Sequence, residues 1–240
     1  MNKAVVISGK ANDAELYIEN FRQNILEPNP NADIFISTWS DSDVNKIIQL
    51  YSPRQIHIEP CDDFIINNIK QMVNNLDIIY YDHDLAKDKK YINPFLMWYK
   101  WIQVGRLFNK DHYDFVIKTR FDVELEKPIL PNGKNNIPGG ADHRGGINDV
   151  IAWGSGEFIS QYLNLFTALK ECYQISEYVH PERFLRAYLI NLLGLNINRT
   201  KHICKVGGVI YNNPLSEGFD LNNLPKVDPS VNSNNYEGWS

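Results

Sequence analysis

Two side chains of opposite charge, Arg120 and Asp122, follow an apolar run near the middle of the chain. The run, residues 114–119 with the sequence DFVIKT, is typical of a buried strand. Open α/β folds place ligand chemistry at the carboxyl ends of parallel strands. A guanidinium suits a phosphate, and a carboxylate suits a divalent cation that bridges phosphates. The pattern therefore favours a nucleotide-diphosphate site, with a surface ion pair as the alternative.

Two segments nearer the N-terminus end in residues that could border such a ligand. An apolar strand expected over residues 4–8 ends at Ser8 and Gly9, and a second over 33–38 is followed by Trp39. A glycine at a strand end lets the backbone approach a ligand closely. An indole at a strand end is a candidate for stacking on a base or sugar ring. The chain contains neither the GxGxxG nor the GxxxxGK[ST] motif, so neither a dinucleotide site nor a P-loop is supported.

In their order along the chain, these segments resemble a group of GT-A-like glycosyltransferases from bacteria and large DNA viruses, related to capsular and lipopolysaccharide synthesis proteins. That group shows patterns like ISGxxR, DxFxxTW and RTRxD, then an Asn-Asp segment before a short strand and an acidic helix start. The corresponding stretches here are residues 7–9, 33–39, 117–122, 146–154 and 180–183. The resemblance extends from about residue 4 to residue 195.

The chain departs from this pattern shortly after Gly9. Ala11 and Asn12 stand where the group has a basic residue, so Lys10 is the partial substitute. The resemblance implies that Ser8, Gly9, Lys10 and Trp39 border the donor nucleotide, which would be a UDP- or GDP-sugar. The sugar would pass to a glycan or another hydroxyl acceptor.

The resemblance also implies a role for the central motif. GT-A enzymes use an Asp-x-Asp sequence to hold a divalent metal against the donor diphosphate, whose developing charge must be stabilised as it leaves. Asp122 would take the metal or diphosphate role, with Mn²⁺ or Mg²⁺ as the cation because its ligands are oxygens. Arg120 stands in the place of the first acid and supplies positive charge itself. Asp82 and Asp84, a literal Asp-x-Asp, form the alternative metal site.

Transfer to a hydroxyl group requires a general base if the reaction inverts the anomeric carbon. Asp149, which precedes a short expected strand, is the first candidate, and Glu182 is the second. Glu182 also has a structural interpretation, because acidic residues favour the first turn of a helix. His143 and Arg144, in a glycine-rich loop, could contact a phosphate or a sugar.

Composition limits the class of protein. The chain has 240 residues, of which 43% are hydrophobic, enough for one large domain with a substantial core. Its net charge of -5 argues against nucleic acid as a partner, because binding phosphate chains needs a basic surface. The sparse cysteines fit a reducing compartment, and we expect neither a signal peptide nor a transmembrane segment. The expected location is cytoplasmic, or the host cytoplasm if the protein is viral.

The elements that must position these residues alternate between strands and helices, which predicts an α/β fold with a mostly parallel central sheet flanked by helices. We expect further strands over 55–58, 78–81, 150–153 and 206–211, and helices over 13–26, 62–75, 94–108, 157–169 and 181–193. On the aromatic helix, Leu96, Tyr99, Val104 and Leu107 are the expected core face.

The expected domain is residues 1–213, with about 1–125 as the nucleotide-sugar half and 126–213 as the acceptor half. Residues 214–240 are expected to form a polar tail. Two other classes of protein stay open. One is a nucleotide-sugar or carbohydrate-binding module without catalysis, and the other is a nucleotidyltransferase that uses Asp82 and Asp84.

Overall fold

The computed structural model describes residues 1–11, 14–76, 78, 92–139, 145–177, 179–202, 204–207 and 209–211. Several predicted features lie outside these residues: the Asp82 and Asp84 pair, His143 and Arg144, the tail over 214–240, and all but Ile78 of the strand expected at 78–81.

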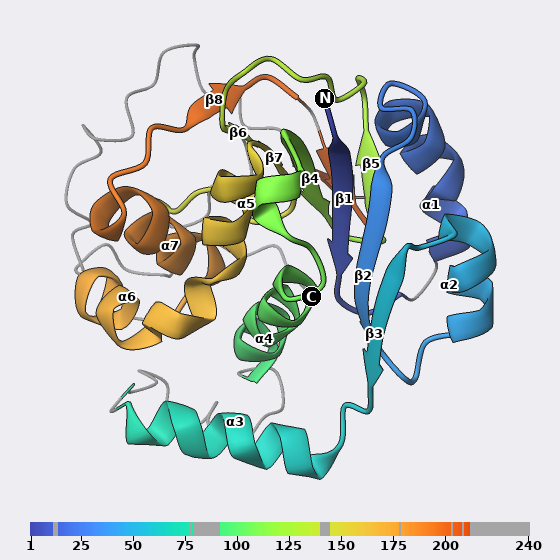
Figure 1. Ribbon diagram of the computed structural model, residues 1–240. Helices are drawn as coiled ribbons and strands as arrows, with labels where there is room; N and C mark the ends of the chain where they lie inside the picture. The colour runs from blue at the N-terminus through green and yellow to red at the C-terminus, as the bar shows by residue number, and fades with distance from the viewer. Residues whose placement is uncertain are drawn as a thin grey trace.

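A seven-stranded sheet forms the centre of the molecule, in the order β3-β2-β1-β4-β7-β6-β8 (Figure 1). Four of its pairs, β1 with β2, β1 with β4, β2 with β3 and β6 with β8, are parallel, whereas β7 is antiparallel to both β4 and β6. This arrangement confirms the predicted α/β class. The strands are β1 (Lys3–Ser8), β2 (Asp33–Trp39), β3 (Gln55–Glu59), β4 (Phe115–Thr119), β6 (Asn136–Pro138), β7 (Ala152–Gly154) and β8 (Asn198–Thr200).

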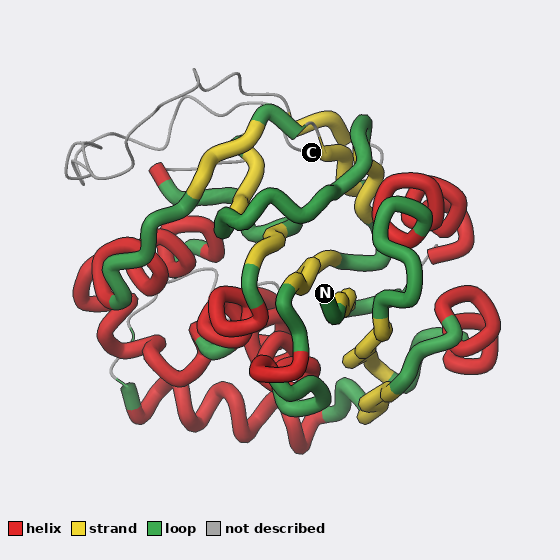
Figure 2. The backbone as a smooth tube through the Cα atoms, turned by 45° about the horizontal axis from the view of Figure 1, so that its top comes forward, coloured by secondary structure: helices red, strands yellow, loops and turns green. Residues whose placement is uncertain are grey.

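Helices cover both faces of the sheet, so the strands lie between two helical layers (Figure 2). The alternation of side chains along β1 divides the core accordingly: Val6 packs with α4 and α5, and Val5 packs with α1 and α2. The helices are α1 (Ala14–Phe21), α2 (Val44–Tyr51), α3 (Asp63–Asn75), α4 (Asn93–Gly105), α5 (Gly156–Leu163), α6 (Leu169–Ser176) and α7 (Pro181–Arg186). Turns of π-helix extend α1 over Arg22–Leu26 and α7 over Ala187–Leu192.

Several elements differ from the sequence-based expectation, among them the short strands β5 (Val123–Leu125), β6 and β8, which were not expected. The helix expected over 157–169 ends at Leu163, where a 3-10 turn over Leu165–Ala168 separates it from α6. The last expected strand is instead a hairpin of β9 (Cys204–Val206) and β10 (Val209–Tyr211), because Gly207 turns the chain at a φ of 55°. The helix α2 was not expected, although Asp43 caps it by accepting from the backbone N–H of Lys46 at 3.1 Å.

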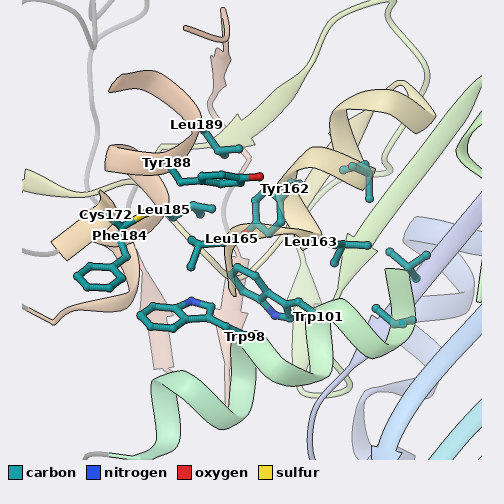
Figure 3. Packing of buried hydrophobic residues seen from close by; sticks show 14 of the residues in the cluster. Trp98, Trp101, Tyr162, Leu163, Leu165, Cys172, Phe184, Leu185, Tyr188 and Leu189 are labelled. Atoms are coloured by element: carbon teal, nitrogen blue, oxygen red, sulfur yellow. The ribbon is translucent and has the colours of Figure 1, made fainter. Parts of the chain in front are cut away.

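The aromatic helix α4 packs one face into the larger core cluster (Figure 3). Its buried apolar residues are Phe95, Trp98, Trp101 and Val104, and Trp98 stacks on Phe184 with the ring centroids 5.0 Å apart. The expected face was therefore wrong except at Val104, because Leu96, Tyr99 and Leu107 are only partly buried.

A second, three-stranded sheet in the order β10-β9-β5 continues directly from the central motif, since β5 (Val123–Leu125) begins one residue after Asp122. The backbone N–H of Gly207 donates to the Asp122 carbonyl at 3.2 Å, which fixes this residue where the chain leaves the large sheet. In the part of the chain that the structure describes, no helix has the length and apolar character needed to span a bilayer.

Candidate functional site

The predicted site residues gather at one edge of the large sheet because of strand direction. In the parallel registers Ile7 pairs with Thr119 and Ser8 with Ser37, so the carboxyl ends of β1, β2 and β4 share that edge. The antiparallel strand β7 pairs Ala152 with Lys118, so its amino end lies at the same edge. Residues separated by more than a hundred positions in the sequence are thereby brought to one place.

At the end of β4, Arg120 and Asp122 form a bidentate ion pair. The guanidinium donates from Nε to Asp122 Oδ1 at 2.9 Å and from an Nη nitrogen to Oδ2 at 2.8 Å. The two side chains are about a third exposed, at 34% and 27%. Such fork-to-fork pairs are directional and resist rearrangement more than a pair of point charges does. The structure therefore shows the ion pair that the sequence left open as the alternative, and contact of these two groups with a diphosphate stays a prediction.

Asp149 lies at the same edge but is buried, with 7% of its surface exposed. Burial raises the pKa of its carboxyl group and the neighbouring Glu182 raises it further, while Lys118, Arg120 and His180 act in the opposite direction. The groups predicted for the diphosphate and for the acceptor therefore act on one another electrostatically. A carboxyl group with a raised pKa is closer to the range in which a general base operates.

Glu182 occupies the first turn of α7, as expected, and is also buried. Its Oε2 lies 2.8 Å from His180 Nδ1. The loop that leads to Asp149 packs against this turn: Ile147 donates its backbone N–H to the Glu182 carbonyl at 3.0 Å. At Gly146 a Cβ atom would come within 2.2 Å of the Glu182 carbonyl carbon, so only glycine fits this approach. The close packing fixes the separation between the two acids.

The corner after β1 has a different character. Ser8 is buried, and Gly9 has a φ of 117° while its N–H donates to the Ser37 carbonyl at 3.1 Å. Lys10 is half exposed and lies 2.7 Å from Asp41 in an ion pair. Beyond Lys10, a cavity of about 310 Å³ is lined by Ala11, Ala14, Glu15, Asp41, Ser42, Asp43, Lys46, Ile47 and Leu50. Its carboxylates can accept from hydroxyl or N–H donors, and two of them are already ion-paired, Glu15 with Lys46 and Asp41 with Lys10.

Trp39 is 6% exposed and packs within the protein. Its ring stacks on Tyr99 with centroids 6.3 Å apart, and the ammonium of Lys100 lies 3.8 Å from its centroid. The predicted stacking on a base or sugar ring would require Tyr99 or Lys100 to move. That role stays a prediction, and in this structure Trp39 supports the end of β2.

Sequence reasoning missed three contributors to the site: Lys118, Tyr162 and His180. Lys118 was taken only as part of a strand, although a lysine inside a buried strand is itself a signal that a polar partner lies nearby. His180 precedes Pro181 and Glu182, a spacing that allows the ring to reach the acid. For Tyr162 the local pattern carries no such signal, because a tyrosine on an amphipathic helix is typical of core packing.

The donor set at this edge does not by itself fit a divalent cation. Both carboxylate oxygens of Asp122 accept hydrogen bonds from Arg120. Among the described residues, no group of three or more His, Cys, Asp or Glu side chains is placed to hold a metal. Metal binding by Asp122 therefore stays a prediction of the sequence.

Comparisons with known proteins were made by sequence and by structure. No family model matches the chain, and no curated protein matches it. Among solved structures, it is similar to mouse xyloside xylosyltransferase 1 in its apo form, with a TM-score of 0.48 and 10% sequence identity. The alignment covers 83% of this chain and 85% of that one.

Proposed function

We propose that this protein is a glycosyltransferase that moves a sugar from a nucleoside-diphosphate sugar to a hydroxyl group of a glycan or another acceptor. One observation carries the proposal: the Arg120–Asp122 ion pair and the buried acid Asp149 share one edge of the sheet. The motif order that resembles GT-A-like glycosyltransferases of the capsule and lipopolysaccharide type supports the same reading.

The diphosphate of the donor would bind at Arg120. The planar guanidinium matches the geometry of phosphate oxygens, and the Arg120 side chain is partly exposed, at 34%. As the bond to the sugar breaks, negative charge develops on the leaving diphosphate, and a preorganised cation stabilises it. Asp122 keeps the guanidinium in one orientation, so Arg120 need not be ordered anew at each turnover.

The nucleoside would occupy the cavity beyond Lys10, with Ser8 and Gly9 between it and the diphosphate. Asp41 and Asp43 line that cavity and suit the hydroxyls of a ribose or the N–H groups of a base. This division assigns about residues 1–125 to the nucleotide sugar and 126–213 to the acceptor. A UDP- or GDP-sugar is the proposed donor, and the proposed location is the cytoplasm.

The acceptor would bind on the side of Asp149 and Glu182. If the sugar configuration inverts, one of these acids takes the proton of the attacking hydroxyl group. We assign that role first to Asp149, because its raised pKa lies nearer to the working range of a general base. Glu182 is the second candidate, and its contact with His180 links it to a second proton-binding group.

The test combines ligand binding with transfer. UDP-, GDP-, dTDP- and CMP-sugars are screened by thermal shift, with and without Mn²⁺ or Mg²⁺, since a ligand of the folded state raises its melting temperature. Release of the nucleotide and labelling of an acceptor are then measured for the parent chain and for Arg120→Ala. We expect that variant to lose about 100-fold or more in transfer rate.

The matched control is Arg54→Ala, which removes an Arg–Asp pair of the same kind. Arg54 lies 2.7 Å from Asp33 at the start of β2, the opposite edge of the sheet. Equal transfer by the Arg120→Ala variant and the parent would reject the site, whereas loss of transfer in both variants would point to a general effect on folding.

One specific observation favours a second function, that of a binding module without catalysis. With Asp122 paired to Arg120, the edge presents a closed ion pair, which also suits a nucleotide-sugar or carbohydrate-binding module without catalysis. A sugar nucleotide that raises the melting temperature, with neither transfer nor donor hydrolysis, would support that module. The nucleotidyltransferase alternative depends on Asp82 and Asp84, which lie outside the described residues.

A further inference from the structure

The ammonium group of Lys118 is fully buried beside the proposed acid. Lys118 lies in β4 with 0% of its surface exposed. Its Nζ donates to the Asp149 carbonyl at 2.5 Å and to the Val150 carbonyl at 3.3 Å. It also lies 4.4 Å from the ring centroid of Trp101 and 5.1 Å from that of Tyr162. A buried cation is costly, so its retention among carbonyls and aromatic rings calls for a role.

The contacts fix the main chain of Asp149 from two directions. Lys118 reaches the Asp149 carbonyl from β4, and the Tyr162 hydroxyl donates to the same oxygen from α5 at 3.1 Å. Directly after it, the Val150 N–H donates to Asn148 Oδ1 at 2.8 Å, which holds the turn into β7. Because two donors bind the Asp149 carbonyl, the main chain at Asp149 is held in one position, and this limits where its carboxyl group can lie.

The charges around Lys118 come from three parts of the fold. Asp149 precedes β7, Arg120 and Asp122 follow β4, and His180 and Glu182 at the start of α7 act through Asp149, while the uncharged hydroxyl of Tyr162 comes from α5. Burial lowers the pKa of Lys118 to about 7, against the opposite effect of Asp149. The cation in turn favours the ionised form of the Asp149 carboxyl group.

We propose that Lys118 is a positioning residue for the acceptor-side acid: it holds the Asp149 main chain against the end of β4 and favours the carboxylate form of Asp149. The inference rests on the proposed function in one respect, namely that Asp149 acts on the acceptor. Its geometric part, a buried cation bonded to the carbonyl of an ionisable residue, stands on the structure alone.

The experiment compares three variants. Lys118→Met removes the charge and both hydrogen bonds at similar side-chain length. Tyr162→Phe removes the other donor to the same carbonyl and no charge. Lys100→Met is the matched control, because Lys100 is also 0% exposed but bonds to Thr38 and Glu59 instead. Sugar transfer is measured from about pH 5 to pH 9, per folded molecule, with melting temperatures taken at each pH to correct for unfolding.

We expect Lys118→Met to lower kcat by about 10-fold or more and to move the acidic limb of the pH profile upward by about one unit, since a carboxyl group loses a neighbouring cation. Tyr162→Phe should lower kcat less and leave the limb in place, and Lys100→Met should leave the limb in place too. If the acidic limb of the pH profile lies at the same pH in Lys118→Met as in the parent, the proposal is overturned.

A second measurement separates this inference from the proposed function. The Asp149 carboxyl group is followed by carbon-13 NMR in chains with labelled aspartate, and the Asp149→Asn variant assigns its signal. We expect the Asp149 pKa to rise in Lys118→Met whether or not transfer is detected. A shifted pKa without transfer from any sugar nucleotide would count against the glycosyltransferase and for the link between the two residues. An unshifted pKa would refute that link even in an active enzyme.

Discussion

Two fully buried lysines show how differently one residue type can be used. Lys100, on α4, lies 2.8 Å from Glu59 Oε1, donates to the Thr38 carbonyl at 2.7 Å and covers the ring of Trp39. Lys118, in β4, donates to two carbonyl oxygens, and its ammonium group lies 4.4 Å from the ring centroid of Trp101. The charge of Lys100 is balanced by the Glu59 carboxylate to which it is hydrogen-bonded. The charge of Lys118 instead acts on the carboxyl group of Asp149, to whose carbonyl it donates.

The comparison suggests different roles for the two clusters. Around Lys100, Glu59 also accepts from the Tyr99 hydroxyl at 3.0 Å and lies 3.7 Å from His57 Nδ1, so the group ties α4 to the ends of β2 and β3. Around Lys118, the nearby acid is itself buried and has a raised pKa. Stability is the expected use of the first cluster, and chemistry that of the second.

The largest expected effect comes from removing the acid beside each lysine. Asp149→Asn should lower the transfer rate by about 100- to 10,000-fold, because a general base is lost. Its melting temperature should change little, because Lys118 loses a neighbouring anion but keeps its two carbonyl acceptors, and a buried carboxyl group with a raised pKa is removed. Glu59→Gln should do the reverse: it leaves the Lys100 ammonium without its anion, which costs about 3–5 kcal/mol of stability. Kinetics and denaturant unfolding of both variants check the pair. If Glu59→Gln abolished transfer in folded protein, the proposed separation of roles would be wrong.

Stability as a function of pH distinguishes the lysines further. Because the folded-state pKa of Lys118 is lowered to about 7 from 10.5, its ammonium destabilises the fold fully below pH 7 and progressively less up to pH 10.5. The stability of Lys118→Met relative to the parent should therefore be most favourable at acid pH and decline between pH 7 and pH 10.5. Melting temperatures of Lys118→Met and of the parent, measured from below pH 7 to pH 10.5, test this expectation. A constant difference would mean that the lysine is not held in a desolvated state.

The spacing between the acids can be altered with a single methyl group. Gly146→Ala places a Cβ within 2.2 Å of the Glu182 carbonyl carbon, so α7 must move away. We expect a loss of about 1–3 kcal/mol from overpacking, together with a lower Asp149 pKa, because Glu182 raises it now. Gly105→Ala, on α4, is the control: its Cβ would lie at an ordinary 3.4 Å from Leu163 Cβ. Urea unfolding measures the loss of stability, and titration of the Asp149 carboxyl group measures its pKa. An unchanged Asp149 pKa would show that the spacing between Asp149 and Glu182 does not influence it.

The smallest effect is expected at the far edge of the sheet. Arg54→Ala removes an exposed ion pair with Asp33, whose carboxylate also accepts from the Tyr113 hydroxyl at 2.7 Å. Such surface pairs contribute about 1 kcal/mol or less, so stability should change little and transfer not at all. Kinetic constants equal to those of the parent would support the placement of the site at the opposite edge.

Much of the fold follows from local patterns, and much of the site does not. The strands at 4–8, 33–38 and 115–119 were predictable because each is an apolar run that the core must bury. The end of α5 at Leu163 was not, since apolar residues continue through the 3-10 turn that follows. For α2, the cap at Asp43 was a readable signal that the prediction did not use.

The candidate site shows the same difference between features that local sequence predicts and features that depend on tertiary contacts. Arg120 and Asp122 could be predicted because a strand end determines where the next side chains lie. The meeting of Asp149 with them depends on β7 running against β4, and no short-range pattern specifies that direction. The burial of Lys118 likewise depends on Trp101 and Tyr162, which come from two separate helices. Tertiary contacts of this kind override what the surrounding strand sequence suggests.

The position of β7 in the chain, after β4, also has a consequence for folding during synthesis. On the ribosome, β4 is complete before the residues that cover its open edge have been made, so the Lys118 side chain of the nascent chain is hydrated and charged. Pairing of β7 brings the Asp149 and Val150 carbonyls to the ammonium group, and α5, which is made later, adds Tyr162. Complete burial of the lysine therefore needs the chain through α5, and a chain that stops short of β7 also lacks the two carbonyls that hold the ammonium group.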